Sequence, residues 1–155
     1  MNNKGQLSLE YMLILSIILT GLILTTNTIQ LEVEKNTILT SAKTGAQTGA
    51  DKNNYAIYYN DTYNNYHANH PRLTYSNQIK IIKTELIQNK DNTLTIQTTA
   101  HTRSLNNHEK QIVSSRINYY IRETITKTYN KTSNTYYDPA YSNNYRITTK
   151  DVIWK

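Results

Sequence analysis

The sequence has no cysteine and no phenylalanine, and its 11 acidic residues are outnumbered by 17 lysines and arginines. The absence of cysteine excludes a disulfide framework, so an exported chain of this composition must hold together by packing or by assembly with further copies. The acidic residues are scattered along the chain. No carboxylate pair suited to acid–base catalysis can therefore be nominated.

Recognisable catalytic and cofactor motifs are also missing. There is no glycine-rich phosphate loop, no nucleophile elbow and no HExxH motif. Four histidines are present, His67, His70, His101 and His108. The first two are three residues apart but precede Pro71 in a polar segment without clustered carboxylates, which is a poor metal site. We expect no enzyme activity, no cofactor and no metal.

The net charge of +6 comes from basic residues that are spread through the chain. No Lys/Arg run and no nucleic-acid-binding motif is present, so the charge favours solubility and not a nucleic-acid partner. Tyrosine is abundant, with 14 residues, and asparagine and threonine are abundant too. Two readings stay open for this composition: a bias toward AT-rich codons, or a Tyr/Asn surface used in adhesion.

Residues 7–24 form an apolar run of membrane-spanning length. At 1.5 Å per residue, about 18 helical residues span roughly 27 Å, close to the hydrocarbon thickness of a bilayer. Lys4 precedes the run, and Glu32 and Glu34 follow it. This charge distribution predicts a single-pass membrane protein with a cytoplasmic N-terminus and a C-terminal domain outside the cell.

The residues before and inside this run do not form an ordinary secretory signal. No Ala-x-Ala-like cleavage site follows Leu24, and Glu10 places a carboxylate at the start of the apolar segment. The segment Lys4-Gly5-Gln6-Leu7-Ser8-Leu9-Glu10-Tyr11 resembles the archaeal class III signal peptide, in which Lys-Gly-Gln-x-Ser-x-Glu precedes an apolar stretch. Proteins with this signal are similar to type IV prepilins.

The resemblance implies processing by a membrane prepilin peptidase, which cuts between Gly5 and Gln6. Residues 1–5 would be the cleaved leader, and the apolar helix would stay in the mature protein. Gly5 suits such a site because it can extend at low steric cost. Glu10 has two readings. In a filament it pairs with the N-terminal amine of a neighbouring copy's Gln6; in a simple anchor it is a carboxylate that snorkels to the headgroups.

Helical spacing continues past the membrane segment, so we expect one long helix from about Leu7 to Asp51. Its later part carries a stripe of small residues at four-residue spacing, made of Ser41-Ala42, Gly45-Ala46 and Gly49-Ala50. Such a stripe allows close approach of another backbone, either from the following hairpin or from another subunit. The alternative is that Gly45 and Gly49 only weaken the helix. Residues 6–52 are assigned to this membrane and assembly helix.

Residues 53–155 are assigned to an external α+β domain with the element order β-β-α-β. A loop at 53–70 precedes a hairpin of strands near Ile79–Ile87 and Leu94–Ala100, where apolar and polar residues alternate. The spacing of the apolar residues then changes to three and four, which predicts a helix over Asn107–Lys127. Asn106 together with Glu109 fits the start of such a helix. A loop at Tyr129–Asn144 leads to a final strand over Arg146–Trp154, with Val152 or Trp154 in the core.

Two sequons for N-glycosylation lie in the expected external loops. They are Asn60-Asp61-Thr62 and Asn130-Lys131-Thr132. In a chain this rich in asparagine and threonine, matches also arise by chance.

Two functions are consistent with these features. The first is a pilin-like structural subunit, major or minor, that assembles into an archaeal surface filament through its N-terminal helix. The second is a processed, membrane-anchored surface protein that binds a ligand and forms no filament. The part from Gly45 to Trp154 also resembles a group of short membrane-anchored methanogen proteins, through its hairpin, its helix with Arg116-Ile117-Asn118-Tyr119-Tyr120 and its late tryptophan. That resemblance implies no established activity.

Overall fold

The structure, a computed structural model, describes residues 3–54, 79–88, 92–103, 105–131 and 138–155. The chain forms two compact units, Met1–Asn36 and Thr37–Lys155, and each is described by itself. The outer part of the first helix thus packs within the same unit as the domain assigned above to residues 53–155. The expected loop at 55–70 lies outside the described residues.

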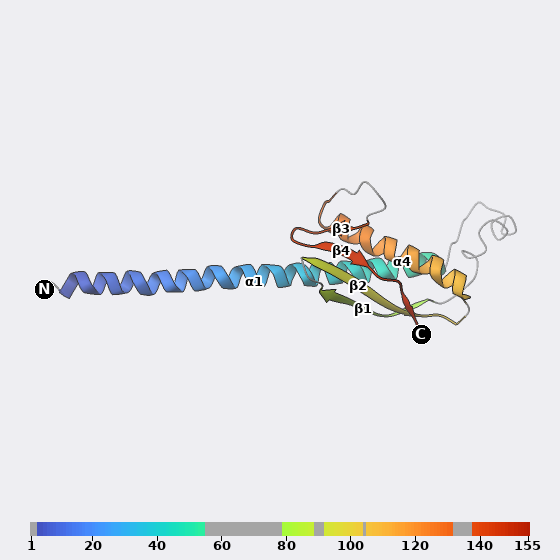
Figure 1. Cartoon of the computed structure of the whole chain (residues 1–155), viewed down its shortest axis with the longest axis horizontal. Coiled ribbons are helices and arrows are strands. Elements are labelled where there is room, and N and C mark those ends of the chain that lie inside the picture. The colour runs from blue at the N-terminus through green and yellow to red at the C-terminus, as the bar shows by residue number, and fades with distance from the viewer. Residues whose placement is uncertain (1–2, 55–78, 89–91, 104, 132–137) are drawn as a thin grey trace. The chain divides into compact units, whose positions relative to one another are not determined.

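Helix α1 (Asn3–Asn54) is the long N-terminal helix that the sequence predicts (Figure 1). It begins four residues earlier and ends three residues later than the predicted Leu7–Asp51. Both prolines of the chain, Pro71 and Pro139, lie after it. Nothing in its sequence therefore removes a backbone hydrogen bond from the helix.

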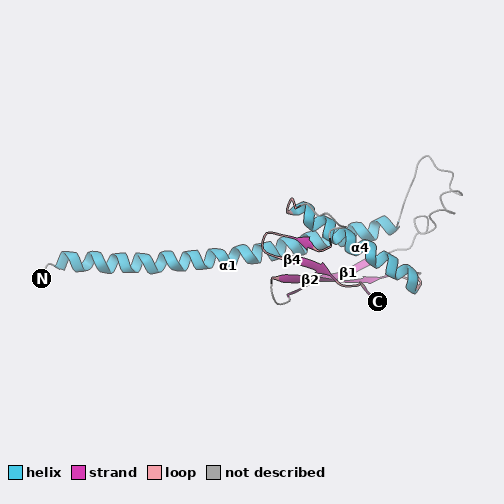
Figure 2. Ribbon diagram, turned by 45° about the horizontal axis from the view of Figure 1, so that its top comes forward, coloured by secondary structure: helices cyan, strands magenta, loops and turns pink. Residues whose placement is uncertain are grey.

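The second unit contains a sheet whose central strand is β2 (Thr93–His101). Strand β1 (Lys80–Gln88) pairs with it in antiparallel fashion, which confirms the predicted hairpin. On the other side, β4 (Arg146–Thr149) runs parallel to β2 (Figure 2). Strand β5 (Ile153–Trp154) pairs with β2 in parallel fashion as well. A short strand β3 (Ala140–Tyr141) pairs with β4 and completes the order β1-β2-β4-β3.

Helix α4 (Asn107–Thr128) confirms the predicted helix almost residue for residue. A capping box starts it: the Glu109 backbone N–H donates to Asn106 Oδ1 at 2.9 Å, and the Asn106 N–H donates to the Glu109 carboxylate at 3.0 Å. At its end, Asn130 N–H donates to Lys127 O and Lys131 N–H to Thr126 O. These two bonds form a Schellman motif, in which Asn130 takes the left-handed conformation, with φ of 50°.

The predicted element order after the hairpin is wrong in two places. The single final strand is divided into β4 and β5, because Val152 between them turns into the core and the Gln97 amide donates to Asp151 O in place of a ladder bond. Strand β3 lies inside the expected loop at 129–144. Two residues beside Pro139 carry too little pattern to be recognised as a strand.

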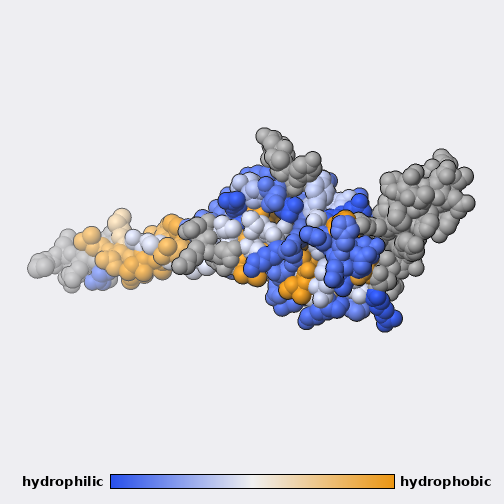
Figure 3. Space-filling view, turned by 45° about the vertical axis from the view of Figure 1, so that its right-hand side comes forward, coloured by the Kyte–Doolittle hydropathy of each residue, from blue (hydrophilic) through white to orange (hydrophobic). Residues whose placement is uncertain are grey.

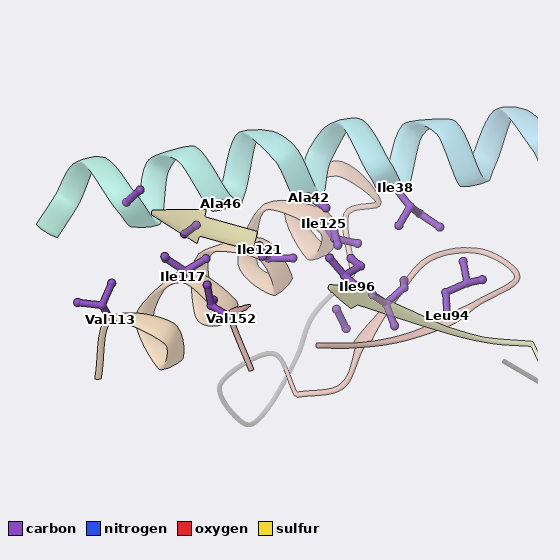
Figure 4. Close-up of a cluster of buried hydrophobic side chains, with 14 of the residues drawn as sticks. Ile38, Ala42, Ala46, Leu94, Ile96, Val113, Ile117, Ile121, Ile125 and Val152 are labelled. Atoms are coloured by element: carbon purple, nitrogen blue, oxygen red, sulfur yellow. The ribbon is translucent and has the colours of Figure 1, made fainter. Parts of the chain in front are cut away.

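The core of the second unit lies between α1, α4 and the helix-facing side of β2 (Figure 4). Helix α1 contributes a line at four-residue spacing, and α4 contributes an isoleucine-rich line at the same spacing. The buried residues are Ile38, Ala42, Ala46 and Ala50 on α1, Val113, Ile117, Ile121 and Ile125 on α4, and Leu94, Ile96 and Ala100 on β2. Ile38 continues the α1 line, while the neighbouring Leu39 is only half-buried.

The small-residue stripe of α1 lies directly against α4. A Cβ atom built on Gly45 would be 2.5 Å from Tyr120 O, and one on Gly49 would be 2.8 Å from Ile117 Cα. One turn before Gly45 on α1, Ser41 Oγ and Thr128 Oγ1 share a hydrogen bond of 3.0 Å. Residue numbers thus rise on α1 as they fall on α4, so the helices pack antiparallel. Close packing of the stripe is confirmed, and its partner within the chain is α4, not the hairpin.

Candidate membrane and assembly site

The first unit exposes large apolar side chains along its helix. Their exposed fractions lie between 39 % and 71 %, for Leu9, Met12, Leu13, Ile14, Leu15, Ile17, Ile18, Leu19, Leu22, Ile23, Leu24, Ile29, Leu31 and Val33. Figure 3 shows apolar side chains of this unit in orange. Helix α1 is long and apolar enough to cross a membrane, with a mean hydropathy of 2.0 over its most apolar window.

The threonines within this apolar stretch have their hydroxyls satisfied by the helix itself. Thr20 donates to Ser16 O at 2.8 Å, Thr28 donates to Leu24 O at 3.1 Å, and Thr25 and Thr26 both donate to Leu22 O. A hydroxyl bonded to a carbonyl in the preceding turn presents mainly its methyl group to the surroundings. These threonines therefore make the surface of the helix less polar than threonines with unbonded hydroxyls would.

Charged residues lie only at the two ends of the stretch. Glu10 is exposed near its start, and residues 11–31 contain no Asp, Glu, Lys or Arg. At the other end, Lys35 Nζ lies 3.0 Å from the Glu32 carboxylate in an exposed pair one helical turn apart. Such surface pairs contribute little stability, at most about 1 kcal/mol. Glu10 is separated from them by the whole uncharged segment.

The residues of the predicted signal lie in the first turns of α1. Lys4, Gly5, Gln6 and Ser8 all have helical backbone, so the expected cleavage bond between Gly5 and Gln6 lies within the helix. The first four N–H groups of a helix have no intrahelical partner, and its first turn unwinds at low cost. A protease can therefore extend this bond without breaking the apolar segment that follows.

The two sequons differ in what the structure shows of them. Asn60 lies outside the described residues. Asn130 is exposed at the end of α4, where its left-handed backbone closes the helix. Asparagine tolerates this conformation better than other residues with a side chain, so Asn130 has a structural reason to be there.

A row of polar side chains on α4, which the sequence analysis missed, holds the C-terminal segment. Trp154 Nε1 donates to Ser114 Oγ at 3.0 Å, Asn118 Nδ2 donates to Lys150 O at 2.9 Å, and Arg122 donates to Thr149 Oγ1. Burial lowers the pKa of Arg122 below its ordinary value, and Asp138 acts in the opposite direction. The four-residue spacing of these polar residues places them on one face of the helix, but it does not distinguish a buried row from a solvated one.

The histidines do not form a ligand cluster in the part of the chain that the structure describes. His67 and His70 lie outside it. The ring Nδ1 of His101 is hydrogen-bonded to Lys155 O, and His108 is exposed on α4. Among the described residues, no group of three or more His, Asp or Glu side chains could hold a metal ion.

Comparison with known proteins identifies the N-terminal segment. Residues 3–29 match the family model of the class III signal peptide. A search of curated proteins and a search of solved structures each gave no significant match. The match confirms the predicted class III signal peptide, and such a signal is consistent with prepilin-peptidase processing and membrane anchoring.

Proposed function

We propose, from the class III signal peptide that the chain carries, that the protein is a pilin-like structural subunit of an archaeal cell-surface filament. A prepilin peptidase removes residues 1–5, and the domain from residue 53 onward lies outside the cell. The observation that carries the proposal is the match over residues 3–29 together with a helix that continues from it without a break. The role is structural and involves no catalysis or cofactor.

The exposed apolar surface supports an assembly role for this helix. Burying one Leu or Ile side chain contributes about 1.5–3 kcal/mol, so the exposed residues of the first unit need a cover of lipid or protein. Cleavage ahead of the helix, and not after it, keeps this surface in the mature protein. A bundle of the same helices from other copies covers it in a filament, whereas lipid covers it before assembly.

A second candidate is a membrane-anchored surface protein that binds a ligand and does not assemble. The uncharged segment between Glu10 and Glu32 fits this candidate equally well, because a simple anchor also needs an apolar helix with charges at its ends. Glu10 separates the two candidates. A filament core gives its carboxylate a specific partner, and an anchor does not.

Processing gives the first test of the proposal. We expect the mature protein to begin at Gln6 and to retain Leu7–Leu24, because the peptidase cuts before the apolar helix. N-terminal mass spectrometry of membrane and filament fractions from the native cells measures this directly. A chain that begins after Leu24 would show an ordinary secretory signal and would exclude the pilin-like function.

We also propose that Asn130 carries an N-linked glycan, since its side chain is exposed on the external domain. Thr132→Ala should remove the glycan and leave the helix cap intact, whereas Thr132→Ser should retain both. Intact-mass spectrometry of protein from the native cells measures the difference. Asn130→Gly separates the roles further, because glycine keeps the left-handed cap without an acceptor amide. Equal masses for the parent chain and Thr132→Ala would show that Asn130 serves the cap alone.

A further inference from the structure

We propose that the segment of α1 that spans the lipid hydrocarbon is Tyr11–Leu31, and that the threonine-rich stretch Thr25–Thr28 lies inside it. Glu10 and Glu32 then lie at the two membrane interfaces. This inference rests on the proposed membrane anchoring and concerns the protein before any assembly. It shifts the span outward from the apolar run at residues 7–24.

The length of the uncharged segment matches the bilayer. Residues 11–31 contain no charged side chain, and 21 helical residues at 1.5 Å each measure about 31 Å. The hydrocarbon core of a typical bilayer is about 30 Å thick. In this register both carboxylates reach the headgroups without crossing any hydrocarbon.

The side chains at the outer end fit lipid better than water. Ile29 and Leu31 follow the threonines and are 60 % and 39 % exposed in the isolated helix. A span that ended at Leu24 would leave both of them in water. It would also place Glu10 three residues inside the hydrocarbon, where an ionised carboxylate is costly.

The threonines do not oppose this placement. Each hydroxyl from Thr25, Thr26 and Thr28 donates to a carbonyl three or four residues earlier, so no donor enters the lipid unsatisfied. The helix is continuous through them, so its backbone groups are satisfied as well. Asn27 and Gln30 are the polar side chains between Leu24 and Glu32 without such a bond in the helix. They lie five and two residues before Glu32, about 7.5 Å and 3 Å along the axis, within reach of the interface.

The absence of cysteine from the chain makes a direct test simple. Single cysteines are placed at Thr26, Thr28, Asn36 and Thr44 of the full chain, which is reconstituted in phosphatidylcholine vesicles of about 30 Å hydrocarbon thickness. A membrane-impermeant maleimide is added from outside, with and without detergent. Asn36→Cys and the exposed Thr44→Cys should react readily, while Thr26→Cys and Thr28→Cys should react at least tenfold more slowly until detergent is added.

The outcomes separate the register of the helix from the rest of the proposed function. Reaction of Thr26→Cys and Thr28→Cys as fast as Asn36→Cys would place the membrane boundary near Leu24 and overturn the register. Protection of Thr44→Cys both in intact vesicles and in vesicles opened by a pore-forming toxin, relieved only by detergent, would also overturn it, because lipid would then cover the helix beyond Leu31. If the chain does not float with the vesicles on a density gradient, the helix does not span lipid at all, and the proposed anchoring fails with it. A slow Thr28→Cys beside a fast Asn36→Cys supports the register whether or not the protein enters filaments.

Discussion

Replacing Gly45 by leucine should destabilise the second unit by about 3 kcal/mol or more. A Cβ at this position would lie 2.5 Å from Tyr120 O and 2.7 Å from Ile121 Cα. Both atoms belong to the backbone of α4, so the clash is relieved only if α1 and α4 move apart. Separation would open the core line of Ile117, Ile121 and Ile125. Thermal unfolding of the full chain in detergent, followed by the near-ultraviolet signal of Trp154, measures the loss.

Two further glycine substitutions calibrate this result. Gly49→Ala should destabilise less than Gly45→Leu, because a Cβ at Gly49 would make one contact shorter than 3 Å, at 2.8 Å from Ile117 Cα. Alanine also favours the helix by about 1 kcal/mol relative to glycine. Gly21→Leu is the matched control, since a Cβ there meets nothing within 4 Å. It should leave the unfolding midpoint unchanged or raise it slightly. An unchanged midpoint for Gly45→Leu would show that the two helices do not pack this closely.

The elements that depend on local pattern could be predicted from the sequence. The apolar run, the alternation in the hairpin and the three–four spacing of α4 each describe a surface that one element must bury, and each element forms where expected. The capping residues Asn106 and Glu109 fixed the start of α4, because their bonds are made within one turn. The class III signal was equally local, as a short run of fixed residue types before an apolar helix.

The partners of these elements could not be predicted in the same way. The stripe at Gly45 and Gly49 shows that something approaches closely, but many surfaces satisfy that need, and α4 follows in the sequence only after the hairpin. The final segment was predicted as one strand because Arg146–Trp154 alternates. Its division depends on Val152 entering the core and on Gln97 replacing a backbone partner, which are both tertiary contacts.

The polar row on α4 shows a similar limit. Ser114, Asn118 and Arg122 look like the solvated face of an amphipathic helix, since their spacing is the one expected of either a solvated or a buried row. Only the position of the C-terminal segment shows that they are partly or wholly buried and hydrogen-bonded. For the candidate site, the sequence likewise identified Glu10 and led to the prediction that it pairs with Gln6 of a neighbouring copy. That pairing stays a prediction, because it involves a second copy.

Glu10 is the residue that decides between the two candidate functions. At the membrane interface its carboxylate is hydrated and needs no specific partner. When the helix leaves the lipid for the core of a filament, the same carboxylate loses its water. It then needs a cation. In the proposed filament, the N-terminal amine that cleavage would create on Gln6 of a neighbouring copy would supply it.

Glu10→Gln should therefore block assembly while leaving membrane insertion intact. Glutamine keeps the size and polarity of the side chain and costs less to bury than an ionised glutamate, so insertion is unchanged or slightly improved. In the filament core, the amine of Gln6 would be left without its counter-charge. Breaking a buried pair in this way costs about 3–5 kcal/mol per contact, enough to reduce incorporation by a hundredfold or more.

The measurement is the amount of variant in purified filaments relative to the amount in the membrane, after mass spectrometry has shown that each variant begins at Gln6. Glu32→Gln is the matched control, because it removes the same charge at the other end of the uncharged segment, where the carboxylate is exposed beside Lys35. It should assemble normally, and Glu10→Asp should assemble in part. If Glu10→Gln enters filaments as well as Glu32→Gln does, or if the parent chain is never found in a filament, Glu10 is an interface residue. The anchored, ligand-binding function should then replace the structural one.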